Sequence, residues 1–251
     1  MPFLGHKTYY RIVGEASKDK KPLLLLHGGP GSTHNYFEVL DRVAWETGRQ
    51  VISYDQIGCG NSYLEGHPEL WTLETWMDEL IALREFLHLD SFHILGQSWG
   101  GMLIIAYLIE KKPQGICSAI ISSGHASSSL WASEQHRMIA LMDEEDQQAI
   151  RQAELTGNFE DPAYLRANDR FMTLHCASTD ENSPECLTRP KRSGKEAYLY
   201  GWGPNEAVAR SMHEGISGSR WELMEGARHM CFVDRHEDYC RILESWLEEH
   251  D

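Results

Sequence analysis

Short apolar runs alternate with longer amphipathic stretches through the first half of the chain. Four apolar runs have the length and flanking turn residues of buried strands: Leu23–Leu26, Val51–Tyr54, Phe92–Leu95 and Cys117–Ile121. Between them, Leu73 to His88 carries an apolar stripe at helical spacing, and Met102 to Glu110 is apolar on all sides. This alternation is typical of a mostly parallel sheet with helices on both faces.

The pattern changes after Gly124. Charged amphipathic helices are predicted over roughly 131–155 and 161–175, and a stretch with Pro, Lys and Arg follows them. We interpret residues 125–204 as a helical lid inserted into a core of residues 1–124 and 205–251, although an ordinary pair of surface helices is the alternative. The core pattern resumes with a predicted helix over 206–216, a strand at Trp221–Met224 and a helix over 236–249.

Composition narrows the range of partners. The chain has 251 residues, enough for one domain with an insertion, and a formal net charge of −15, which disfavours nucleic acids and anionic membranes. The N-terminal residues lack a secretory signal, and no apolar run is long enough to span a bilayer, so a cytoplasmic location is expected. Six cysteines without CxxC spacing predict neither a metal site nor a disulfide framework.

The strongest chemical signal is a G-x-S-x-G motif, Gly96 to Gly100, placed between an apolar strand and an apolar helix. A sharp turn there strains the backbone of Ser98 and exposes its hydroxyl, and glycines on either side avoid collisions with neighbouring backbone. The turn also places the Trp99 N–H at a helix N-terminus, where it stabilises a developing oxyanion. Ser98 is therefore the predicted nucleophile, with Trp99 as one oxyanion donor.

A second oxyanion donor is predicted in the loop after the first core strand, which runs from His27 through Gly28 and Gly29 to Gly31. Glycines let the backbone approach a substrate closely, so the N–H groups of Gly28 and Gly29 are the candidates. A phosphate-binding loop is the rival interpretation, but the spacing is neither GxGxxG nor GxxxxGK[ST].

The general base is predicted from position, because thirteen histidines are available. In folds with this nucleophile turn the base follows the last core strand, and His229 lies just after the predicted strand at Trp221–Met224. His27 adjoins the oxyanion loop and is better suited to bracing that turn.

These segments resemble the proline iminopeptidases, a family of α/β-hydrolase aminopeptidases. The resemblance spans nearly the whole chain and is carried by Tyr9–Arg11, His27–Gly31, Tyr54–Ser62, Gly96–Gly101, Tyr200–Glu206, His229 and Tyr239. It implies an α/β-hydrolase fold, release of an N-terminal residue from short peptides or amino-acid amides, and a role for Glu206 in binding the substrate amine. It calls for no cofactor, and it leaves the oligomeric state open.

The chain also departs from that family. Glu206 is followed directly by a segment similar to a helix that the family has much later, so about forty residues are missing after Glu206. The missing stretch corresponds to the penultimate core strand and the aspartate of the catalytic triad. Asp234, five residues after His229, is the one substitute we considered, and it would have to orient the base from the following helix.

Three functional hypotheses follow. The first is an aminopeptidase, either active or impaired by the absent acid, in which Ser98 attacks and His229 transfers the proton. The second is an inactive relative that binds ligands in the same pocket, and the third is an esterase or acyl hydrolase of the same fold. A deletion variant of a fully active parent remains an alternative origin for the sequence.

Overall fold

The computed structural model describes residues 1–124, 128–200, 220, 222 and 224–251. Its main sheet has five strands in the order β3-β5-β4-β6-β7, and β1 and β2 form a separate antiparallel pair. Strand β3 runs antiparallel to β5, whereas β5, β4, β6 and β7 are parallel. The strands are β1 (Pro2–Phe3), β2 (His6–Lys7), β3 (Tyr10–Val13), β4 (Leu23–Leu26), β5 (Val51–Tyr54), β6 (Phe92–Gln97) and β7 (Ile116–Ser122).

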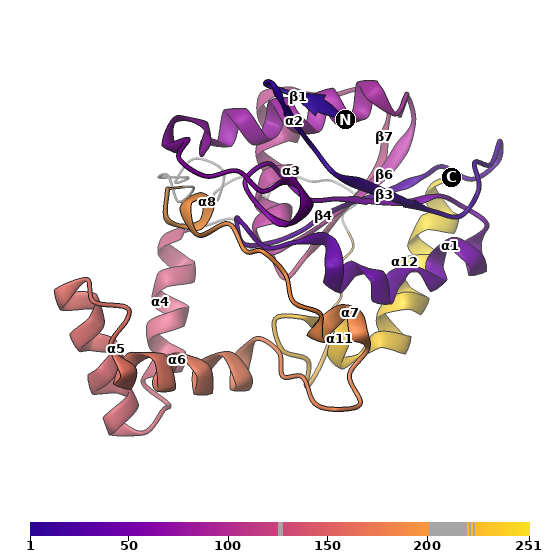
Figure 1. Ribbon diagram of the computed structural model, residues 1–251. Coiled ribbons are helices and arrows are strands. Elements are labelled where there is room, and N and C mark those ends of the chain that lie inside the picture. Colours follow the sequence, from indigo (N-terminus) through magenta and orange to yellow (C-terminus); the bar gives the residue numbers. More distant parts are fainter. Residues whose placement is uncertain (125–127, 201–219, 221, 223) are drawn as a thin grey trace.

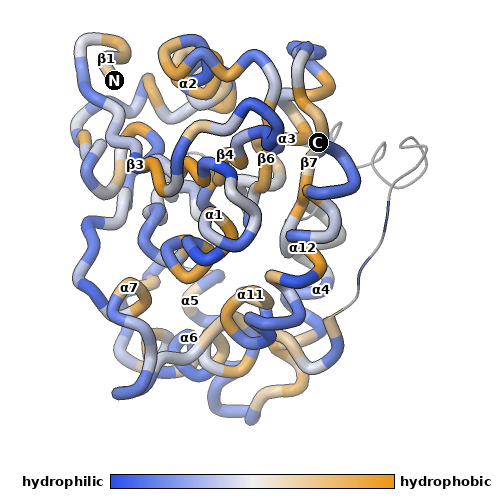
Figure 2. The backbone as a smooth tube through the Cα atoms, turned by 90° about the vertical axis from the view of Figure 1, so that its right-hand side faces the viewer, coloured by the Kyte–Doolittle hydropathy of each residue, from blue (hydrophilic) through white to orange (hydrophobic). Residues whose placement is uncertain are grey.

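Helices cover both faces of this sheet (Figure 1). The core helices are α1 (Arg42–Thr47), α2 (Leu73–Phe86), α3 (Trp99–Glu110), α11 (Cys231–Asp234) and α12 (His236–His250), with 3-10 helices η1 (His34–Leu40), η2 (Gly60–Ser62) and η3 (Pro68–Leu70). Successive residues of a strand point to opposite faces, so Leu24 packs with α2 and α3, and Leu23 packs with α1, η1 and α12. Figure 2 shows the hydrophobic strands β4 and β6 in the interior between these layers.

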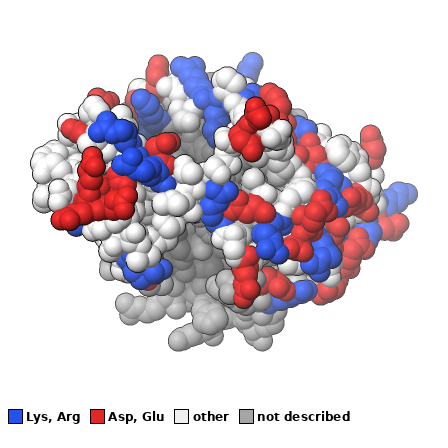
Figure 3. Space-filling model, turned by 90° about the horizontal axis from the view of Figure 1, so that it is seen from below, with Lys and Arg blue, Asp and Glu red and all other residues white. Residues whose placement is uncertain are grey.

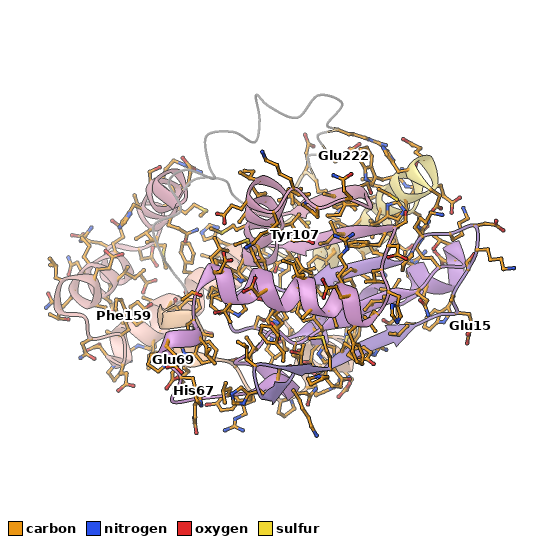
Figure 4. All side chains as sticks on the ribbon, turned by 90° about the horizontal axis from the view of Figure 1, so that it is seen from above. Glu15, His67, Glu69, Tyr107, Phe159 and Glu222 are labelled. Atoms are coloured by element: carbon orange, nitrogen blue, oxygen red, sulfur yellow. The ribbon has the colours of Figure 1, made fainter. Side chains whose placement is uncertain are left out.

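A second group of helices lies between β7 and α11 in the sequence: α4 (Ser128–Ile139), α5 (Glu144–Thr156), α6 (Pro162–His175), α7 (Glu185–Thr188) and α8 (Lys195–Tyr200). Helices α4, α5 and α6 extend from the carboxyl side of the sheet (Figure 1), and Phe159 of the α5–α6 turn lies at the opposite end of the molecule from Glu15 (Figure 4). The predicted lid boundaries remain a prediction, because residues 201–219 lie outside the described residues.

The buried strands agree closely with the sequence analysis. Strands β4 and β5 have the predicted bounds, and β6 and β7 extend the predicted runs by one or two residues. The helix expected over 131–155 is two helices, because the chain turns at 140–143, where Gln147 Nε2 donates to the carbonyl of Met142.

The prediction of a strand at Trp221–Met224 is wrong for the part of this segment that the structure describes. Glu222 and Met224, the two described residues of that segment, lie outside any strand, so within the described chain the sheet ends at β7. An apolar run becomes a strand only when a neighbouring strand accepts its backbone hydrogen bonds. The helix predicted over 206–216 falls outside the described residues. Among the residues that are described, no helix is long and apolar enough to cross a bilayer.

Candidate active site

Ser98 occupies a strained turn between β6 and α3. Its backbone has φ 55° and ψ −120°, a conformation that costs an ordinary L-residue free energy and that persists only where the surroundings enforce it. The Ser98 N–H donates to the carbonyl of Ser122 at 2.9 Å, which ties the turn to the end of β7. Ser98 therefore stands at the carboxyl edge of the sheet, ahead of the N-terminus of α3.

Glycines make this turn sterically possible. A Cβ on Gly96 would lie 2.3 Å from the backbone of Gly100, and a Cβ on Gly100 would lie 2.0 Å from the carbonyl oxygen of Leu26. Real Cβ atoms do not approach backbone atoms so closely, so α3 packs against β6 and β4 only because both positions are glycine. The G-x-S-x-G pattern thus has a packing reason as well as a conformational one.

The loop after β4 lies directly beside the nucleophile turn. A Cβ on Gly28 would be 3.0 Å from the Ser98 Cβ, which places the two loops in contact. The Gly28 N–H donates to Tyr36 Oη at 2.6 Å, and Tyr36 Oη donates to Gln97 Oε1 at 2.9 Å. Tyr36 therefore connects the glycine loop, at Gly28, to Gln97, the residue that precedes Ser98. Its sequence position gave no signal of this role. No hydrogen bond within the described chain uses the Gly29 N–H.

His27 braces this loop, as expected. Its Nδ1 lies 2.9 Å from the carbonyl of Gly28, and its Nε2 accepts from the Gln56 N–H at 3.0 Å. Burial lowers the pKa of His27 to about 4, so the ring is neutral at physiological pH and donates through Nδ1. Gln56 also accepts from Trp99 Nε1 at 3.1 Å, which connects the brace to the first turn of α3.

The loop that carries His229 reaches the same edge of the sheet. The His229 N–H donates to the carbonyl of His175 at the end of α6, and Phe232 stacks on Tyr36 with ring centroids 5.6 Å apart. Cys231 Sγ lies 3.6 Å from Ser122 Oγ at the end of β7. The structure thus brings the loops of Ser98, Gly28 and His229 together, but no hydrogen bond joins Ser98 Oγ to His229.

Asp234 has a different partner from the one considered in the sequence analysis. Its two carboxylate oxygens accept from the guanidinium of Arg228 at 2.5 and 3.1 Å and from the Arg228 N–H at 2.7 Å. The hydrogen bonds from Arg228 hold the pKa of the Asp234 carboxyl below its usual value, against the smaller opposing effect of burial. Asp234 is not hydrogen-bonded to His229. The predicted amine-binding residue, Glu206, lies outside the described residues.

The described part of the chain contains no cluster of three or more His, Cys, Asp or Glu side chains arranged to hold a metal ion. What the site does contain is a strained serine, backbone N–H groups at a helix N-terminus and in a glycine loop, and a neighbouring histidine loop. Such groups are suited to nucleophilic acyl transfer, in which serine attacks a carbonyl and backbone amides stabilise the oxyanion.

Comparison with known proteins agrees with this arrangement. The family profile described as "alpha/beta hydrolase fold" matches residues 21–175. The proline iminopeptidase of Clostridioides difficile (strain 630) is 51% identical over an alignment that covers 100% of this chain and 98% of the relative. The proline iminopeptidase of Lactobacillus helveticus is 49% identical, with 100% and 97% covered. Both alignments span 287 positions, 36 more than the 251 residues of this chain.

Solved structures show the same fold. The crystal structure of the proline iminopeptidase from Mycobacterium smegmatis superposes with a TM-score of 0.80 at 26% identity, covering 99% of this chain and 97% of that one. VinJ superposes with a TM-score of 0.86 at 24% identity, with 100% and 98% covered, which supports the fold alone. The sequence identity over the whole length, together with the shared fold, shows that this chain belongs to the proline iminopeptidase family of α/β hydrolases.

Proposed function

We propose that the chain is a serine aminopeptidase that releases an N-terminal residue, proline or another small apolar residue, from short peptides or amino-acid amides. The observation that carries this proposal is the backbone of Ser98, held at φ 55° between two glycines that pack against neighbouring strands. Such strain is retained where it presents a nucleophile to a substrate. The named activity of the relatives gives the proposal its substrate class.

In the proposed reaction, Ser98 Oγ attacks the scissile carbonyl while its proton passes to His229, which then protonates the leaving amine. A water molecule, activated by the same histidine, hydrolyses the acyl-enzyme. The developing oxyanion is placed between the N–H groups of Trp99 and Gly29. We prefer Gly29 to Gly28 because the Gly28 N–H already donates to Tyr36 Oη. His229 has to approach Ser98 when the substrate binds, as catalytic hydrogen bonds tighten in the complex.

We propose that the 36 alignment positions without a counterpart fall after Glu206 and include the strand that carries the family's aspartate. Asp234 reaches His229 only if it leaves Arg228, so it is a poor substitute. Replacing the acid of a serine protease lowers kcat by about 10⁴, and the proposed activity is therefore expected to be low. Glu206 as amine ligand and a cytoplasmic location belong to the same proposal.

Hydrolysis of prolyl-aminomethylcoumarin by the purified chain tests the proposal, with alanyl-aminomethylcoumarin, N-acetylprolyl-aminomethylcoumarin and a p-nitrophenyl ester as comparison substrates. We expect slow release from the free-amine substrates. Because the losses of triad members are not additive and the acid is already absent, Ser98→Ala should lower this release by a further factor of roughly 10². Acetylation of the amine should abolish turnover, because an aminopeptidase holds the free amine.

The other outcomes separate the alternatives. Ester hydrolysis without need for a free amine would indicate an esterase instead. A folded chain whose turnover equals that of Ser98→Ala would indicate an inactive relative that binds ligands in the same pocket.

A further inference from the structure

A lysine lies over the Tyr36 ring, which packs beside the two loops of the site. Lys191 belongs to the segment Arg189–Gly194, which connects α7 to α8 along the carboxyl edge of the sheet (orange in Figure 1). Its Nζ lies 6.0 Å from the centre of the Tyr36 ring, whose hydroxyl contacts Gly28 and Gln97 beside Ser98. One aromatic ring therefore separates this ammonium group from the residues that flank the nucleophile.

Lys191 also faces the loop of the predicted base. Burial lowers the pKa of His27 in the oxyanion loop and the charge of Lys191 adds to this, whereas burial raises the pKa of Cys176 at the end of α6 and the charge of Lys191 opposes it. The carbonyl of Cys176 accepts from the Met230 N–H, and its neighbour His175 accepts from the His229 N–H. Lys191 thus lies over Tyr36, which is bonded to Gly28, and its charge reaches the end of α6 to which the loop of His229 is attached.

The segment that carries Lys191 is fixed at both ends. Arg189 donates to both carboxylate oxygens of Glu38 at 2.9 and 3.0 Å. At the other end the Arg192 carbonyl accepts from the Gly60 N–H, and the Gly194 N–H donates to the carbonyl of Gly31, each at 2.8 Å. A Cβ on Gly31 would lie 2.4 Å from the Gly194 oxygen, so this segment touches the oxyanion loop directly.

Two nearby arginines are neutralised by carboxylates, whereas Lys191 is not. Arg189 is paired with Glu38 and Glu185, and Arg228 is paired with Asp234. No described acidic side chain forms an ion pair with Lys191, although the chain as a whole carries a net charge of −15 and acidic side chains are common on its surface (Figure 3). Burial of the ammonium group lowers the pKa of Lys191, while the residue as a whole stays accessible to a ligand. An unpaired, partly desolvated cation gains more from a bound anion than a solvated one does.

We propose that Lys191 forms a subsite for the free α-carboxylate of short peptide substrates. This inference rests on the proposed function and adds to it a specificity-determining residue. A short peptide carries a cation at its amine and an anion at its carboxylate, so Lys191 draws the carboxylate toward the loop of Gly31 and repels the amine. In this proposal the leaving group therefore lies on the side of Lys191. Lys191 would thereby set both the direction of the bound peptide and a preference for di- and tripeptides that end in a free acid.

Binding to the Ser98→Ala chain tests this without depending on turnover. Calorimetry would compare prolyl-glycyl-glycine with its C-terminal amide, in Ser98→Ala alone and combined with Lys191→Met, Lys191→Arg or Lys195→Met. Lys195→Met is the matched control, because it removes the same charge four residues further along the chain. We expect Lys191→Met to weaken binding of the free acid roughly two- to five-fold, a factor typical of one accessible ion pair, and to leave the amide unchanged. Lys191→Arg should retain most of the preference.

The two proposals fail differently. Three results would overturn the subsite. The Ser98→Ala chain with Lys191 unchanged could bind acid and amide with equal affinity, it could show no binding of the acid at millimolar concentration, or Lys195→Met could have the same effect as Lys191→Met. Hydrolysis of prolyl-aminomethylcoumarin, which has no carboxylate, reports on the proposed function alone. Turnover without acid preference would remove only the subsite, and acid preference without turnover would remove only the catalytic claim.

Discussion

The buried carboxyl groups of Asp55 and Glu79 have pKa values shifted in opposite directions, because their hydrogen-bond partners differ. Asp55 accepts from the His34 N–H and ring and from the Asn61 N–H. Burial raises the pKa of Asp55, but these hydrogen bonds and the neighbouring histidines outweigh it and bring the pKa below its usual value. Glu79 accepts only from Thr8 Oγ1 and the Ile57 N–H, and burial raises its pKa to about 7.

The raised pKa of Glu79 predicts a pH-dependent stability. The folded chain holds this proton up to about pH 7, whereas the usual value is 4.5, so the free energy of unfolding falls as pH rises through this window. The Glu79→Gln variant keeps an oxygen acceptor but does not titrate. We expect the stability of the original chain relative to this variant to fall by on the order of 3 kcal/mol between pH 4.5 and 7. Urea denaturation at several pH values measures it, and parallel curves for the two proteins would refute it.

At the scale of elements, the site depends on how closely α3 approaches the sheet. Gly100 lies in the first turn of α3, where a Cβ would lie 2.0 Å from the Leu26 oxygen of β4. Gly100→Ala should therefore push α3 away from β4 and destabilise the fold by about 3 kcal/mol. Any turnover should fall together with the stability, because the Trp99 N–H moves with the helix.

Gly157→Ala is the control for this variant. Gly157 follows α5 with φ 70° and has open space around it, so alanine there costs only the left-handed strain of about 1 kcal/mol. Thermal unfolding of both variants compares steric with conformational cost. Equal shifts would show that α3 tolerates the added methyl group.

The elements that the sequence predicted well are those with a local cause. Leu23–Leu26 is apolar at every position because both faces are covered, and such a run identifies its strand without further information. Strand β3, Tyr10–Val13, was not predicted: it is only half-buried and is defined by its antiparallel pairing with β5. The strand predicted at Trp221–Met224 is not found at its described residues, because apolar side chains alone do not supply a neighbouring strand to pair with.

The same distinction holds for the candidate site. The turn around Ser98 and the glycine loop follow from short motifs whose spacing has a steric meaning. Tyr36 and Lys191 gave no such signal, because their importance comes from contacts between segments more than sixty residues apart: Tyr36 with Gln97, and Lys191 with Tyr36. A single sequence shows neither contact.

At the scale of the whole molecule, the end of α12 is joined to the opposite edge of the sheet from the site. Asp251 accepts from the Lys21 N–H at 2.9 Å and from the guanidinium of Arg49 at 3.0 Å, and it lies 3.3 Å from His93 Nε2. These three residues stand before β4, before β5 and within β6. One carboxylate therefore connects α12 to three neighbouring strands, while Phe232 and Tyr36 connect the preceding loop to the site.

This junction predicts that a substitution far from Ser98 weakens the whole fold. The Arg49 side chain is fully buried, and Asp251→Asn removes its nearest carboxylate and leaves Glu248, at 3.7 Å, as the remaining acidic partner among the described residues. This loss should cost about 3 kcal/mol in the free energy of unfolding. Burial opposes ionisation of Asp251, but bonds from Lys21, Arg49 and His93 hold its pKa below the usual 3.8. A carboxyl whose pKa is lowered by folding stabilises the fold above its unfolded value and loses that contribution as pH falls. The difference between the two proteins should therefore be full at pH 7 and shrink below about pH 4.

Urea denaturation of the original chain and Asp251→Asn at pH 7, 5 and 3 measures this difference, with Asp19→Asn, at an exposed aspartate, as the charge-matched control. A cost no larger than that of Asp19→Asn would show that α12 is held by its apolar contacts with Phe37 and Leu23 alone.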